Sequence, residues 1–127
     1  MATRRSKVRA ELMAMDGVVE GPSGFSERDA YWVNGKEVAH FEADDVLEVR
    51  LTRAEIRARR AALRADPRVT LRASSSADWL EVRFSSAEDV AFAVSLASVA
   101  VEAHAGVGDP HALPPSGAAL ARRRRFH

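Results

Sequence analysis

The spacing of hydrophobic and polar positions changes several times along the first half of the chain. Val8, Leu12 and Met15 recur at spacings of four and three, which predicts a helix over residues 6–15. Strand-like segments follow at 18–20, 30–33, 36–42 and 46–51, and Asn34-Gly35 is typical of a two-residue hairpin turn. We therefore predict a three-stranded antiparallel meander between about residues 30 and 51.

The second half alternates helix and strand signals. Residues 52–55 (Thr-Arg-Ala-Glu) match a capping box, which predicts a helix that runs to about Ala65 and stops before Asp66-Pro67. Residues 69–73 and 79–84 alternate like strands, and a second capping box at Ser85-Ser86-Ala87-Glu88 opens the most apolar helix. The chain is thus predicted to form one α+β domain, a mainly antiparallel sheet of about five strands packed by two to three helices, in the order α-β-β-β-α-β-β-α.

The strand pattern also predicts which side chains share a face of the sheet. If the turn after residue 42 centres on Asp44-Asp45, His40 lies opposite Val49 and faces the core. Trp32, Ala39 and Phe41 then lie on the other face. An apolar patch there would be typical of a dimer interface or a ligand groove.

Composition excludes several classes of protein. The 127 residues are the length of one domain, and the absence of cysteine excludes disulfides, thiolate metal sites and cysteine nucleophiles. The longest apolar stretch has about a dozen residues, short of the roughly 20 that cross a bilayer. The Arg4-Arg5 start lacks the uninterrupted apolar segment of an export signal. We expect a cytoplasmic protein that is not inserted in a membrane.

The net charge of +1 conceals an uneven distribution. Four basic residues lie in residues 1–9 and four more are Arg122, Arg123, Arg124 and Arg125, which leaves a body of about −7 between two basic ends. We therefore divide the chain into a basic arm at 1–9, a domain at 10–105 and a Gly-, Pro- and Ala-rich tail at 106–127. Basic ends of this kind can bind phosphate without reading sequence.

Two groups of polar residues are candidate sites. His40, Glu42 and Asp44 alternate and could offer one nitrogen and two carboxylates to a divalent metal, but a single histidine is more often part of a core. We therefore assign no metal ligand, cofactor or catalytic residue, and His40, Glu42, Trp32 and Phe41 are the candidate ligand-binding residues. The second group is a basic helix face that could contact nucleic acid, formed by Arg53, Arg57, Arg60 and Arg64.

One stretch of the sequence resembles a known family. Residues 35–41 (Gly-Lys-Glu-Val-Ala-His-Phe), running on to Leu47-Glu48-Val49-Arg50-Leu51, resemble the Gly-Arg-Glu-aromatic-Ala-His-Leu-His strand and its partner in small luciferase-domain proteins. The similarity extends over about residues 16–103 and includes the strand around Trp79. The chain departs from the family at Glu42, where a second histidine is frequent. The resemblance implies this α+β domain, and it does not imply light emission.

Three functions are compatible with the sequence. The first is a non-catalytic binding or assembly module, for example a homodimer, that uses an exposed sheet face. The second is a nucleic-acid-associated protein that uses the basic ends and the arginine face. The third is a small-ligand or metal-binding protein, or an enzyme, centred on His40.

Overall fold

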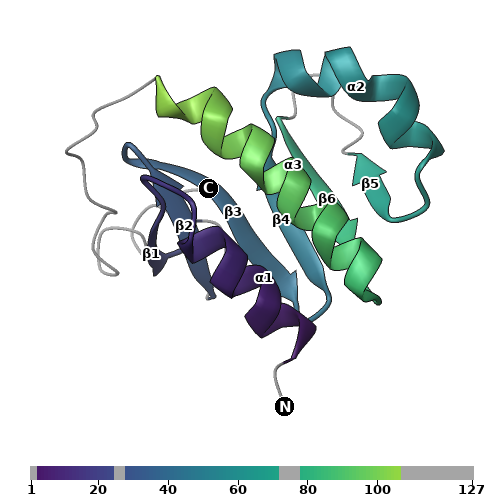
Figure 1. The fold of residues 1–127 in the computed structure, drawn as a ribbon. Coiled ribbons are helices and arrows are strands. Elements are labelled where there is room, and N and C mark those ends of the chain that lie inside the picture. Colours follow the sequence, from purple (N-terminus) through teal and green to yellow (C-terminus); the bar gives the residue numbers. More distant parts are fainter. Residues whose placement is uncertain (1–2, 25–27, 72–77, 107–127) are drawn as a thin grey trace.

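Six strands form one antiparallel sheet, which makes up one layer of the molecule (Figure 1). The computed structural model describes residues 3–24, 28–71 and 78–106. The α+β class is confirmed, and the short strand-like segment predicted at 18–20 forms the first strand, which brings the predicted total of about five strands to six. The strands lie in the spatial order β1-β2-β3-β4-β6-β5, with bounds β1 (Val19–Pro22), β2 (Asp29–Val33), β3 (Lys36–Ala43), β4 (Val46–Arg50), β5 (Val69–Leu71) and β6 (Trp79–Arg83).

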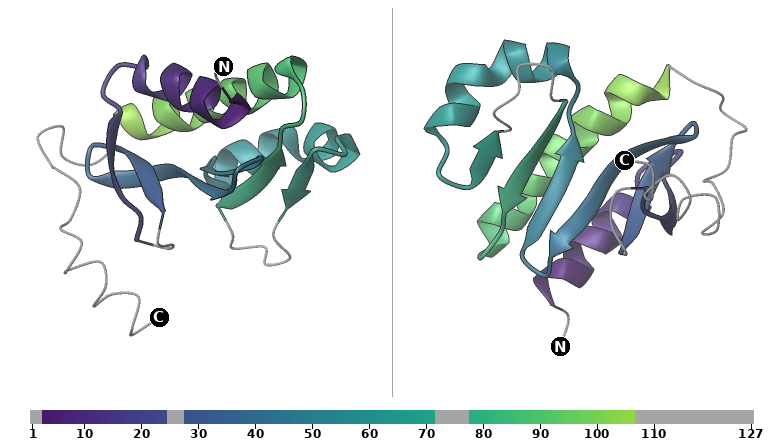
Figure 2. Two further views of the ribbon diagram at one scale, coloured as in Figure 1. Left: turned by 90° about the horizontal axis from the view of Figure 1, so that it is seen from below. Right: turned by 180° about the vertical axis from the view of Figure 1, so that it is seen from behind.

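Three helices accompany the sheet: α1 (Arg4–Met13), α2 (Arg53–Ala65) and α3 (Ala87–Ala105). Helices α1 and α3 pack side by side on one face, and α2 lies beside β5 at the edge (Figure 2). In the described part of the chain, no helix covers the opposite face of the sheet (Figure 2). None of the helices in the described ranges has the length and apolar character to cross a membrane.

Side-chain caps fix where α2 and α3 begin. The Thr52 hydroxyl accepts the backbone N–H of Glu55 at 3.3 Å, and α2 ends at Ala65 as predicted. The cap of α3 lies one residue later than predicted. Ser86 accepts the N–H of Asp89 at 3.1 Å, and the Asp89 carboxylate accepts the N–H of Ser85 at 2.9 Å. Asp89 therefore has the role that the sequence pattern gave to Glu88.

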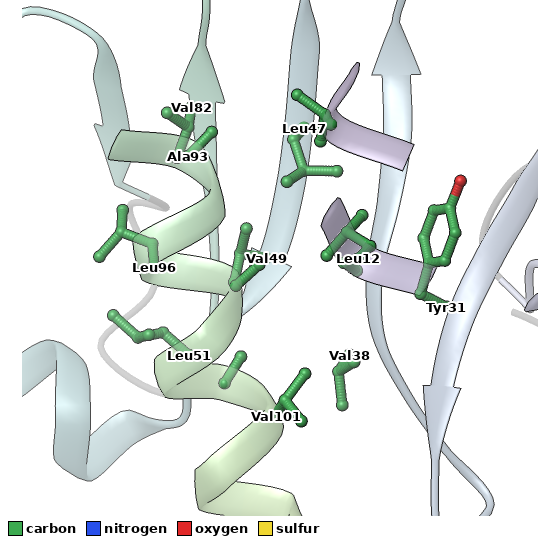
Figure 3. Packing of buried hydrophobic residues seen from close by; sticks show 14 of the residues in the cluster. Leu12, Tyr31, Val38, Leu47, Val49, Leu51, Val82, Ala93, Leu96 and Val101 are labelled. Atoms are coloured by element: carbon green, nitrogen blue, oxygen red, sulfur yellow. The ribbon is translucent and has the colours of Figure 1, made fainter. Parts of the chain in front are cut away.

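The core lies between the sheet and the layer formed by α1 and α3 (Figure 3). Leu47 and Val49 of β4, and Leu51 just after it, point toward these helices and are fully buried. Leu12 of α1 and Leu96 of α3 pack against this cluster. Burying such side chains removes apolar surface from water, which is the main driving force for folding.

The first residues belong to the folded domain instead of forming a separate arm. Helix α1 begins at Arg4, and Val8 is fully buried in the core. The Arg5 guanidinium lies 4.9 Å from the centre of the Phe41 ring, and Arg9 pairs with Glu20 at 2.8 Å. The stripe that holds α1 to the core therefore starts before residue 9, where the sequence predicted the end of the arm. The basic run at 122–125 lies outside the described residues.

The predicted register of β3 against β4 is wrong by one residue. The turn at Asp44-Asp45 has the predicted position, with Ala43 opposite Val46, but Phe41 rather than Glu42 lies opposite Leu47. The cause is a bulge at Glu42, which leaves this residue without a partner in β4. His40 consequently lies opposite Glu48, on the face away from the helices.

Within the described residues, the predicted apolar patch of Trp32, Ala39 and Phe41 therefore does not form. Ala39 and Phe41 belong to the core under the helices, where the Phe41 ring packs edge-on against Tyr31 and Phe84. Trp32 lies on the other face, directly opposite Glu37 in the neighbouring strand, and only 5% of it is exposed. The three residues do not share one exposed surface.

Candidate functional site

A histidine surrounded by carboxylates lies on the sheet face opposite the helices. Nδ1 of His40 is 2.7 Å from a carboxylate oxygen of Glu37. Its Nε2 is 2.8 Å from Glu48 and 3.0 Å from Glu42. His40, Glu37 and Glu48 are each at most 3% exposed, whereas the Glu42 side chain is 40% exposed. We call these four residues the His40 cluster.

A second bulge places Glu37 beside His40. Residues three apart in a regular strand point to opposite faces, because side chains alternate. In β3, however, Tyr31 lies opposite Ala39 and Trp32 opposite Glu37, so that Val38 is an extra residue. Val38 and Ala39 both enter the core, and the alternation resumes with Glu37 and His40 on the same face.

Glu37 is itself held in place by the segment after β1. The Ser23 hydroxyl donates to one carboxylate oxygen at 2.8 Å, and the Gly24 backbone N–H donates to the other at 2.7 Å. Ser23 is fully buried. A carboxylate fixed in this way orients the imidazole ring of His40 and turns its Nε2 toward Glu42 and Glu48.

The indole ring of Trp79 borders the cluster. Its centre lies 5.0 Å from that of the His40 ring, with the two planes inclined at 45°. Trp79 is the first residue of β6, and Arg50, opposite it in β4, pairs with Asp78 at 2.7 Å. The cluster is thereby bounded by a large apolar ring on the side of β6.

The surrounding carboxylates control the charge of His40. Burial by itself lowers the pKa of an imidazole, but hydrogen bonds with Glu37 and Glu48, together with their negative charges, outweigh burial and raise the pKa of His40 to about 9. The ring is thus a cation at neutral pH in this arrangement. Three glutamate side chains surround this imidazole, and their oxygens are donors that suit a cationic ligand.

Three side chains of the cluster have the donor types of a metal site. The ligand atoms of His40, Glu42 and Glu48 lie within 4.8 Å of one another. One imidazole nitrogen and two carboxylate oxygens suit divalent first-row metals. The half-exposed carboxylate of Glu42 connects this otherwise buried set to the surface.

The structure brings together some of the predicted site residues and separates others. His40 and Glu42 are in contact, and Trp32 lies on the same face. Phe41 lies in the core, and Asp44 is 86% exposed and pairs with Arg28 at 3.4 Å, away from the cluster.

Sequence reasoning missed the other two carboxylates of the cluster. Glu48 could have been found, because it alternates with Leu47 and Val49 and must point away from the core. Glu37 could not be found in this way. Its position depends on the bulge at Val38, for which the sequence has no clear signal.

The arginine face of α2 is exposed and distinct from the His40 cluster. Ile56 and Leu63 anchor this helix in the core, and the basic side chains lie on its exposed surface. They are Arg53, Arg57, Arg60 and Arg64.

Comparison with known proteins gives one match. A family model described as "Luciferase domain" matches residues 35–100, more than half of the chain. The matched segment begins in the turn before β3 and contains all four residues of the His40 cluster. No curated protein and no solved structure matches the chain.

Proposed function

The chain belongs to the luciferase-domain family, and we propose that its domain binds a divalent transition-metal ion through His40, Glu42 and Glu48. One observation carries the proposal. The Glu37 carboxylate accepts a hydrogen bond from Nδ1–H of His40, so that Nε2 is directed at two further carboxylates. This carboxylate–histidine pair is the arrangement that orients histidine ligands in metal sites.

The donor set limits the class of metal. Imidazole suits zinc, iron, nickel and copper, whereas carboxylates also suit manganese, and no thiolate is available. Two ligands of one ion, each about 2.1 Å from it, are at most about 4.2 Å apart. The three donor atoms, all within 4.8 Å of one another, therefore need only small movements to reach one ion. A bound ion would replace the proton on Nε2, because histidine binds metals as neutral imidazole.

Titration calorimetry of the full, chelator-treated chain with Zn²⁺ and Mn²⁺ tests the proposal. We expect one ion per chain and at least about tenfold weaker binding for Glu42→Gln, which removes one ligand charge from a half-exposed side chain. Glu102→Gln, an exposed change on α3, is the matched control and should bind like the parent. Equal binding by the parent, Glu42→Gln and Glu48→Gln would show that any ion is held elsewhere, for example by His111 or His127.

A second candidate function is binding of nucleic acid by the arginine face of α2. Its support is the exposure of four arginines on one helix, since such side chains neutralise phosphates and release counterions. Binding to a short duplex should weaken steeply with salt and fall further in Arg57→Glu/Arg60→Glu. If the duplex gives no mobility shift at low salt, this candidate fails.

The structure gives less support to the assembly hypothesis than the sequence pattern did. It depended on an exposed face made by Trp32 and Phe41, and these residues are buried on opposite faces. Homodimer formation and a cytoplasmic location stay predictions. Light scattering tests homodimer formation directly.

A further inference from the structure

A groove runs between α1 and α3 on the outer side of the helical layer. Its cavity volume is about 800 Å³, within the range of about 300–1,000 Å³ typical of small-molecule sites. The residues that matter most for its chemistry are Arg4 and Lys7 of α1, Met15 just after it, and Val90, Ala91 and Val94 of α3. It lies on the other side of the sheet from the His40 cluster, so it is independent of the proposed metal site.

Small side chains create the groove. The two helices pack against each other, and the residues that line the space between them include alanines at positions 10, 87 and 91. Larger side chains at these positions would fill the space. The valines and Met15 give the groove an apolar lining suited to an alkyl chain.

The positive charges in the groove are concentrated toward one end. Arg4 and Lys7 lie in the first turns of α1, and neither has an ion-pair partner among the described residues. The amino-terminal end of the helix dipole adds positive potential there. Glu11, the acidic residue of the groove, lies about 10 Å farther along the helix from Arg4. An anionic headgroup is therefore favoured at the Arg4 end.

The size of the groove distinguishes between possible occupants. A docked helix of three turns fills a cylinder of about 1,300 Å³, which exceeds the cavity. A carboxylate with twelve carbons, at about 30 Å³ per carbon, close to the volume of a water molecule, fills about 400 Å³. One extended chain with a charged end therefore fits within the cavity and agrees with the distribution of charge.

We infer that this groove binds one molecule of a free long-chain carboxylate, with its alkyl chain along Val90, Ala91 and Val94 and its headgroup near Arg4 and Lys7. The affinity should increase by about fourfold for each methylene that becomes buried. Dodecanol, which has the same chain and no charge, should bind more weakly.

The test is calorimetric titration of the full chain with octanoate, decanoate and dodecanoate below their micellar concentrations. We expect one site per chain, and affinity that increases with chain length. Ala91→Trp, which fills the groove from an exposed helical position, should abolish binding. Arg4→Glu/Lys7→Glu should weaken it at least about fivefold. Arg57→Glu/Arg60→Glu is the matched control on α2 and should bind like the parent, and circular dichroism should show the same helix content in all variants.

Several outcomes would overturn the inference. One is no heat with dodecanoate, and another is unchanged affinity in a folded Ala91→Trp variant. Binding to anionic vesicles without binding of the monomeric carboxylate would identify a membrane surface as the partner instead. A doubled mass in light scattering that is lost in Ala91→Trp would assign the groove to a second copy of the chain.

Discussion

Glu37 and His40 are three residues apart in one strand, and yet their side chains meet at 2.7 Å on the same face of the sheet. The extra residue Val38 makes this possible, because the bulge reverses the alternation between them. Bulges occur frequently next to functional sites, where they redirect a side chain. Here the bulge at Val38 buries a carboxylate beside an imidazole, and the second bulge, at Glu42, moves His40 opposite Glu48.

Replacing Glu37 by glutamine should lower the pKa of His40. The amide keeps the shape of the side chain and a hydrogen-bond acceptor but removes a negative charge that stabilises the imidazolium. We expect the pKa in the chelator-treated protein to fall from about 9 by about one unit or more. NMR titration of the His40 ring measures it, and Glu102→Gln should leave it unchanged. An unaltered pKa in Glu37→Gln would mean that Glu37 does not stabilise the cation.

The stability of the metal-free protein should depend on pH through His40. The folded pKa of about 9 exceeds the ordinary value of 6.5, so this contribution is fully present below pH 6.5 and is lost as pH rises through 9. The difference corresponds to about 3 kcal/mol. Urea unfolding between pH 6 and pH 9.5 should show this decrease in the free energy of unfolding for the parent and a flatter profile for His40→Gln. Parallel profiles in the two proteins would contradict it.

Phe41→Asp should unfold the domain instead of altering an interface. Phe41 is 1% exposed and packs against Tyr31 and Phe84, so an aspartate there would bury a charge in the core and remove these aromatic contacts. Phe41→Ala should cost about 3–5 kcal/mol in the free energy of unfolding. Denaturant unfolding followed by circular dichroism measures both. A folded Phe41→Asp variant with only a changed oligomeric mass would restore the interface hypothesis.

Asn34 links the β2–β3 hairpin to the end of α3, and its loss should destabilise the domain. Its side-chain amide donates to the backbone carbonyls of His104 at 3.1 Å and Ala105 at 2.8 Å. Asn34→Asp loses this donor and places a negative charge at the negative end of the helix dipole, which should cost about 1–3 kcal/mol. Because Asn34 has a φ of 52°, Asn34→Gly is the control that keeps the turn but removes the amide.

Thermal unfolding ranks these two variants. Asn34→Asp should melt below Asn34→Gly, because only the aspartate adds repulsion to the lost hydrogen bonds. If both melt at the temperature of the parent, the contact between the hairpin and α3 contributes nothing to stability.

Local chemistry made much of the fold predictable. Thr52 at a cap, Asn34-Gly35 in a turn and Pro67 after a helix act through neighbouring residues, so their effects can be read without the fold. The cap of α3 lies one residue later than predicted because Asp89, and not Glu88, is the carboxylate that accepts a backbone N–H at the start of the helix. The full extent of α1 was not predicted, because its cap at Thr3 and the buried Val8 lie in a stretch whose basic residues indicated a separate arm.

The sequence by itself determined the elements, their order, the antiparallel meander and the family, because periodicity, caps and turns depend on residues close in the chain. Only the tertiary structure decided which side chains meet. Two bulges, at Val38 and Glu42, changed the faces and partners that simple alternation predicts for β3. A shift of one residue in a strand exchanges its two faces, since the side-chain period is two. His40 was expected on the core face and instead lies in a carboxylate cluster, whereas Phe41 was expected on the surface and lies in the core.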